Sequence, residues 1–170
     1  MKARLLYLVL PGVLMAAVVT ASPARAEERT CRGALGAKTV DNLRVPSGAT
    51  CTLAGTRVKG TIKVERGATL KASAIRVIGN IQAENARRVD VVGSQIGGSV
   101  QIVQSRNSST LSKLDRNLVK QDVQYFENRG AIAITQNRIN GNLQCKANQP
   151  RPTGGGNVVG GSKQDQCARL

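Results

Sequence analysis

Apolar residues return along the chain in pairs, with one polar residue between the two members of each pair. The first members, 19, 19, 19, 23 and 20 residues apart, are Leu43, Ile62, Ile81, Val100, Val123 and Leu143. The second members are Val45, Val64, Ala83, Ile102, Tyr125 and Cys145. This alternation predicts a short strand with one buried face in every repeat.

Two further columns of apolar residues have the same spacing. One column holds the pairs Cys51 and Leu53, Leu70 and Ala72, Val89 and Val91, and Ile132 and Ile134. The other holds Val58, Val77, Ile96, Val119 and Ile139. Each period therefore contains three short strands, and turn residues such as Gly67 and Gly97 separate them.

A repeat of this kind predicts a solenoid. A unit of about 19 residues cannot bury its own apolar face, but stacked units bury it when each strand pairs with its equivalent in the next coil. We expect an all-β fold, a single-stranded right-handed parallel β-helix of about five to six coils, because crossovers between parallel strands are almost always right-handed. An antiparallel sandwich or barrel also has many short strands, but it predicts no fixed register of apolar pairs.

The first 26 residues have the layout of a secretory signal peptide. Lys2 and Arg4 precede an apolar run, and Ala24-Arg25-Ala26 offers a cleavage site of small residues. An uncleaved membrane anchor is the alternative, but the run is short and is interrupted at Pro11-Gly12. We therefore expect a cleaved leader at 1–26 and a secreted or cell-envelope location, without stable membrane insertion after cleavage.

The remainder of the chain divides around the repeats. We expect an N-terminal cap at 27–42, the β-helix at 43–145 and a C-terminal cap loop at 146–170, for which a flexible tail is the alternative. The stretch 103–116 carries about four extra residues, which predicts a loop that projects from one corner. Loss of Lys2, Arg4 and Arg25 with the leader reduces the 25 basic residues to 22 against 10 acidic ones, a net charge of +12.

Four cysteines behind an export signal predict two disulfides in an oxidising compartment. Cys31 and Cys51 are 20 residues apart, and Cys145 and Cys167 are 22 apart, so each gap is about one coil. Residues one coil apart have Cα atoms roughly 5 Å from each other, which a disulfide accepts. We expect Cys31–Cys51 and Cys145–Cys167 to staple the two ends, and we expect a monomer because covered ends oppose end-to-end stacking.

No catalytic residue, metal or cofactor is predicted. The chain has no histidine and no CxxC pair, which removes the usual zinc ligands and Ser/His or Cys/His nucleophiles. Glu65 and Glu84 are 19 residues apart and stack on neighbouring coils. Two interpretations are open, a weak cation site or two solvated corner residues beside Arg66. A minimal polysaccharide-active enzyme with a lyase-like or hydrolase-like activity remains the alternative function.

Outward positions form a candidate ligand face. Lys63, Gln82, Gln101, Gln124 and Gln144 lie between the inward pairs, and Arg57, Lys59 and Arg76 flank the third apolar column. A row of amides can hydrogen-bond a glycan chain, or the amides can bond one another along the axis. We expect an anionic glycan or cell-wall polymer as partner, with solubility as the alternative role of the charges. Nucleic acid is not expected, because aromatics that would stack bases are only 2% of the chain.

Three segments carry a family resemblance. The segments "VPSGATCTLAGTRVKGTIKVERGATL", "GNIQAENARRV" and "NGNLQCKANQPRPTGGGNVVGGSKQDQC" resemble small exported bacterial proteins of unknown function, and the likeness covers 31–170. More distantly, the coils look like pectin-lyase-type β-helices and like bactofilins, which polymerise end to end. The resemblance implies a β-helix. It implies no activity, because the clustered aspartates of the lyases are absent and the leader and paired cysteines depart from bactofilins.

Overall fold

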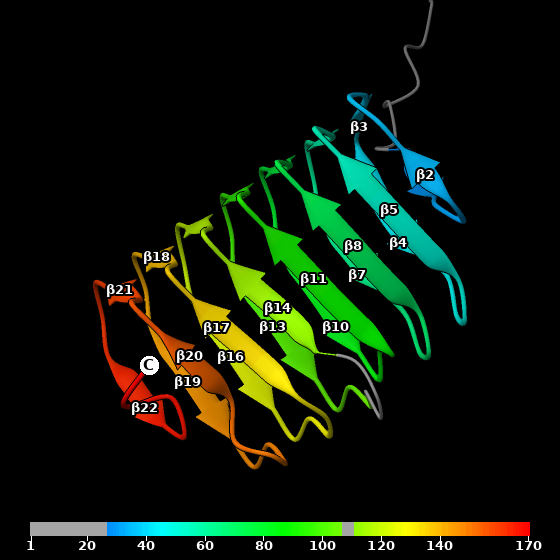
Figure 1. The fold of residues 1–170 in the computed structure, drawn as a ribbon. Coiled ribbons are helices and arrows are strands. Elements are labelled where there is room, and N and C mark those ends of the chain that lie inside the picture. Colours follow the sequence, from blue (N-terminus) through cyan, green and yellow to red (C-terminus); the bar gives the residue numbers. More distant parts are fainter. Residues whose placement is uncertain (1–26, 107–110) are drawn as a thin grey trace, which may run out of the picture.

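The computed structural model describes residues 27–106 and 111–170. Within these ranges the chain is all β, with 22 strands that wind around one axis. The strands form three parallel sheets of eight, seven and seven strands, so the molecule is a prism of about seven coils (Figure 1). The solenoid is confirmed, with about one coil more than the sequence predicts. The leader expected at 1–26 lies outside the described residues.

The first sheet, called sheet A, is the longest and runs the full length of the prism. Its strands in spatial order are β1 (Glu28–Thr30), β4 (Asn42–Val45), β7 (Ile62–Val64), β10 (Ile81–Glu84), β13 (Val100–Val103), β16 (Val123–Phe126), β19 (Leu143–Lys146) and β22 (Lys163–Asp165). Leu43 pairs with Ile62, and the register continues through Ile81, Val100 and Val123 to Leu143. The first predicted column is therefore a single file.

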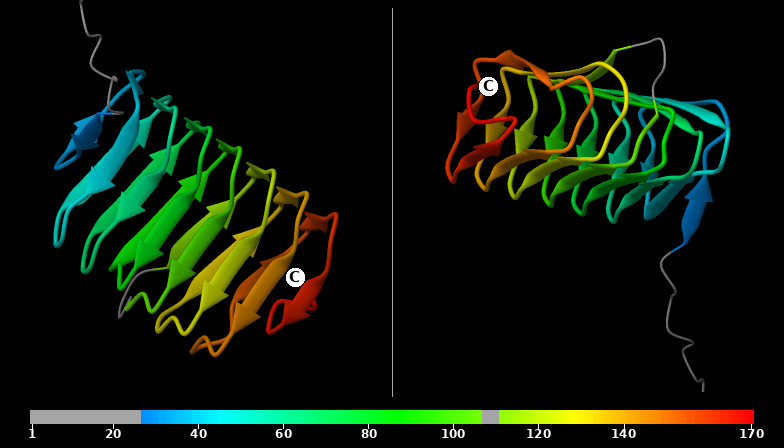
Figure 2. Two further views of the ribbon diagram at one scale, coloured as in Figure 1. Left: turned by 180° about the vertical axis from the view of Figure 1, so that it is seen from behind. Right: turned by 90° about the horizontal axis from the view of Figure 1, so that it is seen from below.

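Sheets B and C complete each coil. Sheet B contains β2 (Ala34–Leu35), β5 (Thr50–Ala54), β8 (Thr69–Ser73), β11 (Arg88–Val92), β14 (Ser112–Asp115), β17 (Ile132–Thr135) and β20 (Thr153–Gly155). Sheet C contains β3 (Thr39–Val40), β6 (Arg57–Val58), β9 (Arg76–Val77), β12 (Gln95–Ile96), β15 (Leu118–Val119), β18 (Arg138–Ile139) and β21 (Val158–Val159). Sheets A and B face each other, and the two-residue strands of sheet C form a narrow side (Figures 1 and 2).

The interior is one apolar core shared by all coils. Every first-column residue from Leu43 to Leu143 is at most 1% exposed, and Val58, Leu70 and Ile139 from the other columns are equally buried. Side chains of similar size stack in files, which lets neighbouring coils keep the strand spacing of about 4.8 Å. The alternation predicted from the sequence therefore separates inside from outside on all three sheets.

Glycine is needed where the coils approach most closely. Gly60, Gly79 and Gly98 stand above one another at the corner between sheets C and A, and their backbones hydrogen-bond in series. A Cβ atom at Gly79 would lie 2.6 Å from the carbonyl oxygen of Gly60. Gly67, at the corner between sheets A and B, has a φ of +69°, which favours glycine for a different reason.

Two ladders of buried asparagines line the corners of the C-terminal coils. Asn117, Asn137 and Asn157 form the ladder between sheets B and C, and Asn128 and Asn148 belong to the ladder between sheets A and B. The Asn137 amide nitrogen donates to the Leu114 carbonyl at 2.8 Å and to the Asn157 side-chain oxygen at 2.9 Å. These side chains bond both the backbone and the next rung, so their burial leaves no polar atom unpaired.

Disulfides join neighbouring coils near the two ends. Cys31 is bonded to Cys51 with Cα atoms 5.5 Å apart, and Cys145 is bonded to Cys167 with Cα atoms 5.2 Å apart. Both predicted pairings are confirmed. At the C-terminal end Cys167 and Leu170 are buried against the core, so the final turn covers the last coil.

The segments expected as caps take part in the solenoid. Range 27–42 contains β1, β2 and β3, and range 146–170 contains β20, β21 and β22, which continue the three sheets. These terminal coils lack the apolar pairs that mark the others, which is why the sequence pattern does not extend to them. Within 103–116, β13 ends at Val103 and β14 begins at Ser112, and residues 107–110 lie outside the described residues.

Candidate functional site

The predicted amide row is a true column on the outer face of sheet A. The register aligns Lys63 with Gln82, Gln101, Gln124 and Gln144. The column extends further than predicted, to Arg44 at one end and Gln164 at the other. Its members project from strands in the same sheet, so one rigid backbone positions all of them.

The column divides into two parts with different bonding. The Gln124 amide nitrogen donates to Gln144 and the Gln144 amide nitrogen donates to Gln164, both at 2.8 Å. Gln82 and Gln101 face each other in register, but within 27–106 and 111–170 their side chains have no hydrogen-bond partner. The ladder predicted as the alternative to ligand binding is therefore formed only in the C-terminal coils.

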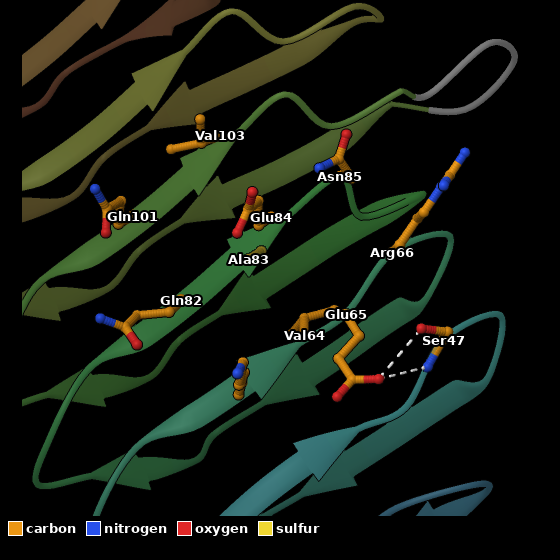
Figure 3. Close-up of a pocket in the computed structure, with 11 residues that line it drawn as sticks. Ser47, Val64, Glu65, Arg66, Gln82, Ala83, Glu84, Asn85, Gln101 and Val103 are labelled. Carbon is orange, nitrogen blue, oxygen red and sulfur yellow. Dashed lines mark hydrogen bonds between the residues drawn. The ribbon is translucent and has the colours of Figure 1, made fainter.

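A groove of about 530 Å³ crosses sheet A at the unpaired amides. Its polar walls are formed by Ser47, Lys63, Glu65, Arg66, Gln82, Glu84, Asn85 and Gln101. The backbone at Val64 and Ala83 forms the floor, and Val103 lies at one side (Figure 3). A second hollow of about 280 Å³ shares Gln82 and Gln101 and reaches Gln124, so the unpaired amides lie between two depressions.

The acidic side chains of the groove are in different states. Glu65 accepts a hydrogen bond from Arg44 at 3.3 Å. It also accepts hydrogen bonds from the backbone nitrogen and the hydroxyl of Ser47 at 3.0 and 3.2 Å (Figure 3). The Arg44 hydrogen bond, followed by those from Ser47, lowers the pKa of Glu65 below its ordinary value. Glu84, by contrast, has no hydrogen-bond or ion-pair partner in the described part of the chain.

The groove therefore carries a small positive excess among its free groups. Arg44 is shared between Glu28 at 2.8 Å and Glu65 at 3.3 Å, so one guanidinium faces two carboxylates and this cluster keeps one net negative charge. Lys63, Arg66 and Glu84 are left without ion partners among the described residues. Two free cations, one free carboxylate and two unpaired amides form a surface rich in hydrogen-bond donors.

The basic half of the candidate ligand face lies on another sheet. Arg57 and Arg76 are neighbours in the outward column of sheet C, and Lys59 follows directly after β6. The Lys59 ammonium lies 2.9 Å from a carboxylate oxygen of Asp41, and this hydrogen bond, together with the charge of Lys59, lowers the pKa of Asp41. The structure thus places the amide column and the basic residues on two faces of the prism, with the glycine corner between them.

The corner between sheets A and B carries arginines that the sequence reading did not group. Arg87, Arg106 and Arg129 occupy equivalent turns of successive coils, and the last two are paired through their backbones. Arg106 and Arg129 line a hollow of about 370 Å³ in which Gln104 donates to Glu127 at 2.9 Å. These arginines are 19 and 23 residues apart, the same spacings as in the apolar column. This spacing in the sequence could have shown that they stack on successive coils.

Neither a membrane-spanning helix nor a metal site is present among the described residues. In the ranges 27–106 and 111–170, no helix is long and apolar enough to cross a membrane. No group of three or more His, Cys, Asp or Glu side chains is placed to hold a metal ion in the same ranges.

Comparison with known proteins gives no relative from which a function can be carried over. No family model matches the chain, and neither a curated protein nor a solved structure matches it. The functional conclusion therefore rests on the geometry of the surface.

Proposed function

We propose that the protein is an exported, non-enzymatic binding module that holds an anionic glycan or cell-wall polymer in the groove on sheet A. The single observation that supports this most directly is the pair of unpaired amides, Gln82 and Gln101. Amides offer donors and acceptors to sugar hydroxyls, and Lys63 and Arg66 at the groove favour carboxylate or phosphate groups on the chain.

The rigidity of the surface supports the same proposal. Gln82 and Gln101 project from β10 and β13, which are paired along four residues. A ligand therefore meets side chains whose backbone is already ordered, which lowers the entropic cost of binding. The two disulfides are compatible with an oxidising, extracytoplasmic compartment, where such polymers occur.

The experiment compares two pairs of glutamines from one column. Gln82→Ala with Gln101→Ala removes the unpaired amides, and Gln124→Ala with Gln144→Ala removes bonded ones. We expect the first pair to weaken retention on immobilised anionic wall polymer by about tenfold, since each lost hydrogen bond contributes roughly 0.5–1.5 kcal/mol. The second pair should change retention by less than about threefold. Equal losses in both variants, or no retention of the wild-type protein, would contradict the proposal.

One observation favours the enzymatic alternative enough to test it. Glu65, Glu84 and Arg66 line the same groove, as a polysaccharide-cleaving site would require. Glu65 is held ionised by Arg44 and Ser47 and is a poor general acid, so Glu84 is the candidate. Release of new chain ends from an anionic polysaccharide by the wild-type protein, and its loss in Glu84→Gln, would establish this alternative.

A further inference from the structure

The narrow side of the prism combines positive charge with exposed apolar side chains. We define the sheet C face as the first residue of each two-residue strand together with the residue that follows the strand. It carries Arg57, Lys59, Arg76, Lys120 and Arg138, whereas Asp41 is its only carboxylate in the described ranges. Asp41 is already paired with Lys59, so four basic side chains on this face are free of ion partners among described residues.

The large apolar side chains that the described part of the protein exposes are on this same face. Ile78 is 49% exposed and Val158 is 61% exposed, and the half-buried Leu118 lies between them along the prism. Val158 stands beside Arg138 in the outward column, and Leu118 stands on the other side of Arg138. Apolar and basic side chains therefore alternate from Leu118 to Val158. Nearer the N-terminal end of the same row of short strands, Arg57 and Arg76 are direct neighbours.

A hollow of about 100 Å³ lies in the middle of the face. The residues at its rim are Arg76, Ile78, Gln95, Gly97, Leu118 and Lys120. It exists because Gly97 has no side chain between Ile78 and Lys120. A Cβ atom at Gly97 would collide with the carbonyl oxygen of Ile78, so the depression is fixed by the approach of the two coils.

We propose that the sheet C face docks on an anionic phospholipid surface, with a phosphate headgroup in the hollow between Arg76 and Lys120. Free basic side chains are attracted to anionic headgroups, and Ile78, Leu118 and Val158 reach the boundary with the acyl chains. A dissolved polyanion would satisfy the charges but would leave the apolar side chains in water. The apolar component therefore favours a lipid surface over a polymer for this face.

The proposal describes attachment to a surface, with the prism lying on its narrow side. The row of seven strands is roughly 30 Å long, so several headgroups can be contacted at once. The glycan groove is on sheet A, so the polymer and the lipid would be held on different faces. The two proposals are independent, and either can fail without the other.

The test measures partitioning of the chain from Glu27 onward, which contains every described strand and both disulfides. Vesicles of phosphatidylcholine with phosphatidylglycerol are compared with vesicles of phosphatidylcholine alone. We expect binding to the anionic vesicles only. Arg76→Gln with Lys120→Gln should weaken it roughly thirtyfold, since each basic residue near an anionic surface contributes about a factor of five.

A matched variant separates this face from general charge attraction. Arg87→Gln with Arg129→Gln removes the same charge from the corner between sheets A and B, and it should weaken partitioning by less than about threefold. Ile78→Ser with Val158→Ser keeps the charge and should abolish the binding that survives at high salt. Thermal melting of each variant controls for folding.

Three outcomes would overturn the proposal. The first is absence of binding to anionic vesicles. The second is an equal loss of vesicle binding in Arg76→Gln with Lys120→Gln and in Arg87→Gln with Arg129→Gln. The third is binding of soluble polyphosphate in place of vesicles, unchanged by Ile78→Ser with Val158→Ser, which would assign the face to a polymer.

Discussion

The coils before residue 107 and the coils after residue 110 share one interior but differ at their corners. At the corner between sheets B and C, the N-terminal coils place Thr56, Ile75 and Ser94 where the C-terminal coils place asparagines. On the outside of sheet A, Gln82 and Gln101 are unpaired, whereas Gln124, Gln144 and Gln164 bond one another. The same coil can therefore be completed by apolar or hydroxyl side chains, or by amide ladders.

Residue type alone therefore does not assign a role in a solenoid. A glutamine stabilises the stack when its side chain bonds that of the next rung. Gln82 and Gln101 are in register but do not bond each other, so they are available to a ligand. The C-terminal coils use amides to stabilise the fold, and the N-terminal coils leave them at a groove. Four changes test this division, beginning with the one of largest effect.

The shared interior is tested by a charge in either half. Ile81→Asp and Ile134→Asp each place a carboxylate at a position that is 0% exposed, which costs several kcal/mol because the charge loses its hydration. We expect both variants to lose the cooperative unfolding transition in far-UV circular dichroism. Survival of one half in limited proteolysis would show that the two sets of coils fold separately.

The asparagine ladder is tested at its middle rung. Asn137→Ala removes the acceptor of the Asn117 backbone nitrogen at 3.0 Å and the donor to Leu114 at 2.8 Å. We expect the free energy of unfolding, measured with urea, to fall by about 2–4 kcal/mol, because the buried backbone groups lose their hydrogen-bond partners. Asn140→Ala, an exposed change in the same coil, should cost less than about 0.5 kcal/mol. Equal effects would remove the ladder as a stabilising feature.

The two kinds of glutamine are expected to differ in stability by a smaller amount. Gln144→Ala breaks the hydrogen bonds to Gln124 and Gln164 and should lower the free energy of unfolding by about 1 kcal/mol. Gln82→Ala breaks none among described residues and should change it by less than about 0.5 kcal/mol. Urea denaturation checks both values, and a larger loss at Gln82 would contradict its assignment to ligand binding.

The smallest effect concerns pH and is confined to the N-terminal coils. Because Arg44 and Ser47 lower the pKa of Glu65 from its ordinary value of 4.5, ionised Glu65 stabilises the fold above that pH. This contribution is lost as the pH falls through the lowered pKa of the folded state. We expect Glu65→Gln to flatten the acid limb of the melting temperature against pH. An unchanged acid limb would exclude Glu65 as its source.

The sequence was sufficient for the fold because the period is carried by residues that point inward. The spacing from Leu43 to Leu143 located one file of the core, and the cysteine spacings located both disulfides. The terminal coils escaped prediction because β1 and β22 contain no inward apolar pair. The asparagine ladders escaped it because an asparagine between strands suggests a turn, although the spacing of 20 from Asn117 to Asn137 and to Asn157 was visible.

The candidate surface was predictable column by column but not as a whole. Spacing aligned Gln82 with Gln101 and Arg57 with Arg76, because both pairs are one coil apart. It did not tell whether the two columns share a face, since that depends on how sharply the backbone bends at Gly60 and at Gly79. Neither the groove at Gln82 nor the hollow at Gly97 has a linear signature, because each is formed by the gap between successive coils.

The stacking of equivalent coils also has a consequence for how such a protein can change in length. Each coil contacts only the coil before it and the coil after it. Genetic duplication or deletion of one complete coil therefore leaves every remaining interface between a pair of similar coils. The outward-facing residues of a coil can then vary while its inward-facing residues keep the strands in register. A protein with this architecture can acquire a new binding surface by duplication of one coil and substitution of its outward-facing residues.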